Sequence, residues 1–298
     1  MTVLQSESLP PEIWSLICQD PIFERFDLNS ISSISHAIRE EARRVLSYRF
    51  PCLQGASRVK AWCLSLRCRP HLALKIQGLV LLLPQHFHIE NIILLKLTLH
   101  MCVNLKELVV LFQERHLRRT RLQEPNYSSS THMLNDHPFK LTKFVNRYFF
   151  QDDENFKTFL KSQRYLESLE LHSGDTRVYK VRLRVRRLKL LACCPRILHG
   201  YYPSCDLPNQ MRLRLDFKFP LRPSNLEIAV LGSILRGYFL SNNKLTSLAI
   251  LSKQEKFHVL GMIPLLIELC RPGRNLNVNP INIQHLEIHQ FFPTQVCS

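Results

Sequence analysis

The chain has 298 residues, of which 45% are hydrophobic and 21% are charged, a composition that indicates a folded protein and excludes a disordered one. No stretch approaches the roughly 18 continuous apolar residues of a membrane helix, and the N-terminus lacks the basic and apolar regions of a secretory signal. The net charge of +16 permits attraction to nucleic acid or to acidic proteins and establishes neither. We therefore expect a cytoplasmic or nuclear protein whose ten cysteines are reduced.

The first 50 residues predict three short helices. A Pro-Pro pair at positions 10 and 11 suits the opening of the first helix. Its apolar residues then recur at i, i+3 and i+4 spacing, as Ile13, Leu16 and Ile17. Asp27 is a suitable N-cap for the second helix, and the third runs over residues 38–50 until Pro51 stops it. Helices this short bury little surface, so they need a neighbour to cover them.

These residues carry a resemblance to a known family. Leu9-Pro10-Pro11-Glu12-Ile13, with Ile17, Asp27-Leu28 and Ile34-Ser35-His36-Ala37-Ile38, resembles the F-box motif. The resemblance implies a helical module that docks on the Skp-type adaptor of a Skp–cullin–F-box ubiquitin ligase, and through it on a cullin. The family's adaptor-contacting positions fall on Leu9, Pro10, Ile13, Ile17, Leu28, Ile31, Ile34 and Ser35. The alternative is that residues 9–50 form only the N-terminal cap of a solenoid.

After a fourth predicted helix over residues 56–69, the pattern L-x-x-L-x-L recurs, which is typical of the strands of leucine-rich repeats. The copies begin at Ile76, Leu105, Leu141, Leu166, Val185, Leu245 and Ile283, and the alternating stretch 212–217 supplies another strand. Helical candidates lie between them at 89–103, 153–164, 226–240 and 257–270.

The spacing of these units is uneven, which indicates an irregular horseshoe. Each strand–helix unit has an apolar face that it cannot bury alone, so the units must stack. The alternative is an ordinary α/β domain with a parallel sheet, whose strands are typically continuous apolar runs. Here the strands alternate Leu with charged or amide residues, so we expect one face to be wet. Residues 113–138 have no apolar period and predict a long surface loop.

The predicted fold is therefore mixed α/β. A three-helix F-box module at 1–52 is followed by a helical connector at 53–75 and by an irregular leucine-rich-repeat solenoid, an α/β horseshoe, at 76–298.

Motifs for catalysis are lacking. The chain contains neither G-x-S-x-G nor G-x-x-x-x-G-K. His86-x-His88 and the group Cys193, Cys194, His199 and Cys205 do not match the spacing of a closed zinc site. We predict that the protein is not an enzyme by itself and holds no cofactor or metal.

One surface feature comes from a run of alternating cations and apolar residues. On a strand, this alternation would place the cations on one face. The members of this basic row are Arg177, Lys180, Arg182, Arg184, Arg186 and Arg187. Because arginine pairs bidentately with carboxylate and phosphate, the row is a candidate site for an acidic or phosphorylated partner. The alternative is a solvated face on a basic protein.

Two functional hypotheses follow. In the preferred one, the chain is the substrate receptor of a Skp–cullin–F-box ubiquitin ligase, with a protein target held on the repeats and no membrane or nucleic-acid partner. In the alternative, it is a basic repeat scaffold that binds nucleic acid or an acidic protein without a ligase.

Overall fold

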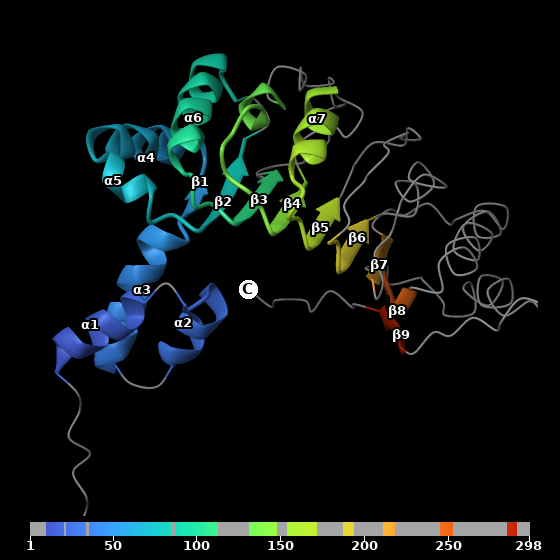
Figure 1. Ribbon diagram of the computed structural model, residues 1–298, viewed down its shortest axis with the longest axis horizontal. Coiled ribbons are helices and arrows are strands. Elements are labelled where there is room, and N and C mark those ends of the chain that lie inside the picture. The colour runs from blue at the N-terminus through green and yellow to red at the C-terminus, as the bar shows by residue number, and fades with distance from the viewer. Residues whose placement is uncertain are drawn as a thin grey trace, which may run out of the picture.

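A computed structural model describes residues 10–20, 22–33, 36–84, 87–112, 131–147, 154–171, 187–193, 211–217, 245–252 and 285–290. It shows a mixed α/β chain in which three N-terminal helices are joined to one long parallel sheet. Figure 1 shows these three helices below the N-terminal end of the sheet, with α4, α6 and α7 along one side of the strands.

The N-terminal helical module consists of α1 (Pro11–Gln19), α2 (Arg25–Ile31) and α3 (His36–Arg49). Pro11 occupies the first position of α1, as predicted, because a helix does not use that N–H group. The predicted start of α2 was three residues late. Asp27 is the third residue of the helix, where its carboxylate accepts a hydrogen bond of 2.9 Å from the Glu24 N–H. An acidic side chain suits both the N-cap and the third position of a helix, because at either place its oxygens can accept hydrogen bonds from unpaired N–H groups.

Nine described strands form the sheet, all parallel and in chain order. They are β1 (Cys52–Gln54), β2 (Gly78–Leu83), β3 (Glu107–Phe112), β4 (Lys143–Asn146), β5 (Ser168–Leu171), β6 (Leu190–Cys193), β7 (Met211–Phe217), β8 (Leu245–Ser252) and β9 (His285–Gln290). A doubly wound sheet reverses its strand order at a switch point. An order that follows the chain instead stacks each unit on the one before it.

The described helices between the strands are α4 (Ala56–Cys68), α5 (Pro70–Ala73), α6 (Ile89–Met101), the 3-10 helix η2 (Thr131–Leu134) and α7 (Glu154–Ser162). Residues 53–75, expected as a connector, contribute to β1, α4 and α5. Their buried side chains belong to the same core as the sheet. The segment is therefore part of the sheet domain.

The core of the sheet domain is a ladder of apolar side chains. From β2 to β8, each strand places one large residue in register beside the equivalent residue of the next. All are at most 2% exposed: Leu79, Leu108, Phe144, Leu169, Leu191, Leu213 and Leu248. Phe156 and Phe159 of α7 pack with the ring of Phe144 at centroid distances of 6.0 and 5.2 Å. The inward-facing side chains of the strands and the apolar side chains of α7 thus pack together in one layer.

The predicted register of the sixth strand was wrong by three residues. Leu191 pairs with Leu169 and Cys193 with Leu171, so the repeated pattern is Leu188-x-x-Leu191-x-Cys193. The sequence suggested Val185-x-x-Leu188-x-Leu190 because it offers large residues at all three positions. Cys193 nevertheless fills the third position, since a buried thiol behaves as a small apolar side chain.

The expectation of one wet face was also wrong for the N-terminal strands. The face away from the ladder carries the half-buried apolar residues Val80, Leu82, Val109 and Leu111 on β2 and β3. Charged side chains reach this face further along, at Glu170 and Arg214. The parallel strands themselves were predicted correctly, but β2 and β3 lack the polar outer face that the sequence analysis expected.

The end of the predicted loop 113–138 is structured. Residues 131–134 form η2, in which Met133 and Leu134 are buried in the core. Residues 113–130 and the helical candidates at 226–240 and 257–270 lie outside the described residues.

Candidate interaction surfaces

The helical module has a small core of its own. Its buried members are Cys18, Leu28, Ala42, Val45 and Phe50. Leu28 is fully buried there, so the structure does not present it to an adaptor as the resemblance implied. Ile31 is half-buried and packs against the same cluster. The reason is packing geometry, since Leu28 is the inward residue of a two-turn helix and its aliphatic side chain holds α2 against α3.

The outer side of the helical module exposes several large apolar side chains. Ile13 and Leu16 of α1 are 41% and 67% exposed, and Ile17 is half-buried. After α1, Ile22 and Phe26 are also exposed, Phe26 by 78%. The apolar stripe predicted for α1 thus faces solvent, while Cys18 contributes the buried contact of this helix. An apolar face turned outward on a small group of helices indicates a surface for another protein.

The other expected adaptor residues are only partly described. Pro10 is exposed just before α1, while Leu9, Ile34 and Ser35 lie outside the described residues. Sequence reasoning missed Leu16, Ile22 and Phe26 as surface residues. The periodic spacing already placed Leu16 beside Ile13, whereas Ile22 and Phe26 have no periodic signal that could reveal their exposure.

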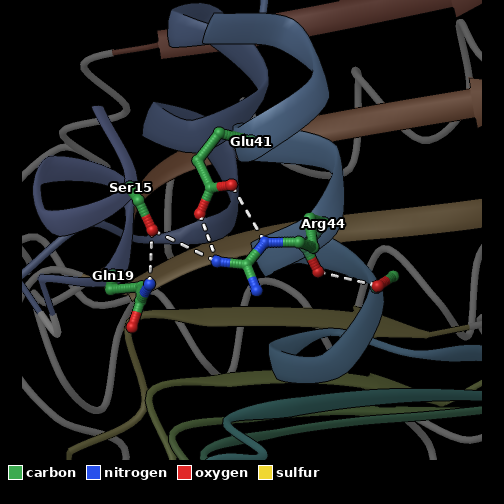
Figure 2. A network of polar contacts seen from close by, with 5 residues as sticks. Ser15, Gln19, Glu41 and Arg44 are labelled. Atoms are coloured by element: carbon green, nitrogen blue, oxygen red, sulfur yellow. Dashed lines mark hydrogen bonds and ion pairs between the residues drawn. The ribbon is translucent and has the colours of Figure 1, made fainter. Parts of the chain in front are cut away.

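A polar network fixes α1 against α3 (Figure 2). Arg44 donates to Glu41 through Nε at 2.9 Å and Nη2 at 2.6 Å, and its Nη2 also donates to Ser15 Oγ at 3.2 Å. Gln19 Nε2 donates to the same hydroxyl at 2.7 Å. The hydrogen bonds from Arg44 lower the pKa of Glu41, with burial opposing them. The network therefore fixes the orientation of α1 relative to α3.

Arg49 joins the helical module to the sheet. Its side chain is buried, and its guanidinium donates to Asp20 O and Phe23 O at 3.0 Å each, both in the link between α1 and α2. It also donates to Gln77 Oε1 at 2.6 Å, and the Gln77 N–H donates to Arg49 O at 2.9 Å. Arg49 thus connects the α1–α2 link with the residue that precedes β2. This planar donor fork suits such a junction better than a lysine would.

The expected basic row is almost entirely outside the described residues, which include only Arg187 of its members. Arg187 is exposed, and its Cζ lies 5.0 Å from the ring centroid of Tyr165. The described strand β6 begins at Leu190, after the row ends. The structure therefore does not test the proposed alternation of cations over residues 177–186.

The open sheet face holds paired charges at its centre. Arg214 Nη2 lies 2.6 Å from Glu170 Oε2, although β6 runs between their strands. The register places Ala192 between the two residues. Its methyl group is small enough for the arginine to pass over it. The charges of Glu170 and Arg214 are paired with each other within the fold, which makes them a poor candidate for binding an external charge.

Reactive chemistry is sparse in the part of the chain that the structure describes. Within it, no group of three His, Cys, Asp or Glu side chains could hold a metal ion. Burial raises the pKa of the Cys63 thiol and raises that of Cys102 to about 12, so both are poor nucleophiles. Among the described helices, none combines the length and the apolar character needed to cross a membrane.

Comparison with protein-family models and with curated proteins finds no match to this chain.

Proposed function

We propose that this chain is the substrate-recognition subunit of a Skp–cullin–F-box ubiquitin ligase. The helical module docks on the Skp-type adaptor, and the stacked strand units, as irregular leucine-rich repeats, hold a protein target. The chemistry of ubiquitin transfer belongs to the partner subunits, so this chain needs no catalytic site of its own.

The observation that carries the proposal is the exposed apolar side of the helical module. Ile13 and Leu16 project from a helix that the Arg44 network anchors to α3. Burying an exposed Ile or Leu side chain in an interface contributes about 1.5–3 kcal/mol. Ile13 and Leu16, together with the exposed Phe26 of α2, are the apolar side chains that would form the centre of this interface.

The arrangement of the sheet supports the second half of the proposal. The strands follow chain order and their described helices lie along one side, which is the arrangement that a leucine-rich-repeat horseshoe would have (Figure 1). Among the described helices, α4, α6 and α7 lie along one side of the strands, and the proposal places the target on the other face. The Arg49 junction connects the helical module to the residue that precedes β2, so an adaptor and a target would be held in a defined relation.

The experiment is co-expression with a Skp-type adaptor followed by co-purification. We expect stable 1:1 co-elution of the full chain, and loss of at least about 100-fold in affinity for Ile13→Asp/Leu16→Asp, because two apolar contacts are replaced by charges. Leu28 is unsuitable for this test since a charge there would unfold the core of the helical module.

The matched control is Ile93→Asp/Leu97→Asp on α6, which makes the same kind of change at two exposed apolar positions outside the helical module. It should leave co-elution intact. If the wild-type chain purifies folded and without adaptor, the helical module is a solenoid cap and the basic scaffold hypothesis takes its place. Equal effects of the two double variants would also refute the helical module as the docking site.

A further inference from the structure

The N-terminal ends of five neighbouring strands carry a line of exposed polar residues. The first residues of β2 to β6 pair in register, as Gly78, Glu107, Lys143, Ser168 and Leu190. Three residues before each of them lies an exposed side chain. We call this set the edge row; its members are Lys75, Asn104, Lys140, Tyr165 and Arg187.

The three cations of the edge row have no carboxylate partner among the described residues. Nearby cations do: Lys189 Nζ lies 2.8 Å from Glu167 Oε2, and Lys143 Nζ lies 4.0 Å from Glu107 Oε2. Lys106 and Arg164, which lie close to the row in sequence, are exposed cations as well. The edge row is thus a net positive surface whose charges the described fold does not neutralise.

Aromatic rings hold these cations in place. Lys140 Nζ and Arg187 Cζ lie 5.1 and 5.0 Å from the ring centroid of Tyr165. Lys75 Nζ lies 5.8 Å from the ring centroid of Tyr48, at the end of the row next to the helical module. Such contacts restrict long flexible side chains, which reduces the entropy that a ligand must overcome when it binds them.

The same contacts disfavour a single-stranded nucleic acid. Lys140 and Arg187 come from the units on opposite sides of Tyr165, and both lie within cation–π distance of its ring. Proteins that bind single strands without sequence preference stack bases on open aromatic faces. The Tyr165 ring is already in contact with two cations, whereas a carboxylate-bearing segment needs no aromatic face.

The spacing of the row fits an extended polypeptide. Lys75, Lys140 and Arg187 occur on every second strand, and strands lie about 4.8 Å apart, so the cations recur about every 9.6 Å. A polyproline II chain, which is extended, rises about 3.1 Å per residue and makes one turn in three residues, so every third side chain lies on the same face, about 9.3 Å apart. Carboxylates at every third position of a segment in the polyproline II conformation would therefore meet successive cations.

We propose that the edge row binds an extended acidic segment of a partner protein, with Asp or Glu at every third position. The inference extends the proposed function by giving the chemistry of its target, and the two fail separately. Peptide binding requires no adaptor, and adaptor binding requires no peptide.

The test is fluorescence anisotropy with the full chain in low salt. One labelled peptide, blocked at both ends, is Asp-Ser-Thr-Asp-Ser-Thr-Asp, and the second has the same composition with its three Asp residues adjacent. The edge variant is Lys75→Gln/Lys140→Gln/Arg187→Gln. Its matched control, Lys60→Gln/Arg67→Gln/Lys161→Gln, makes the same charge change at exposed positions on α4 and α7.

We expect the spaced peptide to bind more tightly than the clustered one. Three exposed ion pairs of about 0.5 kcal/mol each correspond to a loss of about tenfold in the edge variant, against less than about twofold in the control. Absence of binding, equal binding of the two peptides, or equal losses in both variants would overturn the proposal. Tighter binding of a uridine decamer that is lost in the edge variant would overturn it in favour of a nucleic-acid site.

Discussion

The junction at Arg49 gives the sharpest test of how the helical module is held. Its guanidinium belongs to a residue that is 3% exposed, and it donates to two carbonyls of the α1–α2 link and to the Gln77 side chain. Replacing Arg49 by Met keeps a long side chain but removes every donor. The acceptors then lose charged hydrogen bonds worth about 1.5–3 kcal/mol each, while relief of the desolvation of the guanidinium offsets part of this loss. We expect a net destabilisation of about 2–4 kcal/mol for the helical module.

The two tryptophans make the assay specific. Trp14 lies in α1 of the helical module, and Trp62 lies in α4 and packs against the sheet core. Urea unfolding followed by fluorescence reports the helical module in a Trp62→Phe background and the sheet domain in a Trp14→Phe background. Arg49→Met should lower the Trp14 transition by the full amount and the Trp62 transition by less, because the ladder of core residues does not depend on Arg49.

The matched control is Arg43→Met on the same helix. Arg43 is exposed and lies 3.6 Å from Glu40, an ion pair whose loss should change stability by no more than about 0.5 kcal/mol. If Arg49→Met and Arg43→Met shift the Trp14 transition equally, the junction does not stabilise the helical module and the reasoning is refuted.

Two further predictions concern the sheet domain. A Cβ atom on Gly78 would lie 2.6 Å from Cδ1 of the buried Phe50 ring, so Gly78→Ala should lower the free energy of unfolding by about 1–3 kcal/mol in thermal melts. Adding Phe50→Leu should recover part of that loss, and an unchanged melting temperature in the single variant would contradict the close approach. Burial lowers the pKa of His137, with His100 and Lys96 adding to the effect and the Met133 carbonyl and Asp136 opposing it. The unfolded chain therefore binds the proton more readily, so stability should be full above about pH 6.5 and fall as the pH drops below it, and His137→Phe should flatten this dependence in urea titrations at several pH values.

Local patterns were sufficient for much of the fold. The start of the first helix and both ends of the third and fourth were predicted within two residues, because a Pro-Pro opening, a regular apolar stripe and a following proline act within one or two turns. The parallel strands at Leu79, Leu108 and Leu169 were also predicted, since the motif places each inward residue relative to its own chain. Whether a strand has one open face or two buried faces depends on what packs against it, so its own residues do not decide this. The expected polar face was wrong for β2 and β3, which carry the apolar residues Val80 and Val109 there.

The candidate surfaces could be predicted only in part. The stripe of Ile13, Leu16 and Ile17 was visible as a pattern, but a pattern does not say whether the core or the solvent lies beside it. Leu28 and Phe26 are two residues apart in one helix, and one is fully buried while the other is 78% exposed. Only the packing of α2 on α3 decides which of them is available to a partner.

The sequence by itself determined the N-terminal helices, the recurring apolar strands and the strong positive charge, because each depends on residues close together in the chain. The tertiary structure decided which distant residues meet. Arg49 reaches Gln77 across 28 positions, and Lys140 and Arg187 converge on Tyr165 from the two neighbouring units. These contacts follow from the strand register and from side-chain reach, which are properties of the stacked units and cannot be read from any one of them.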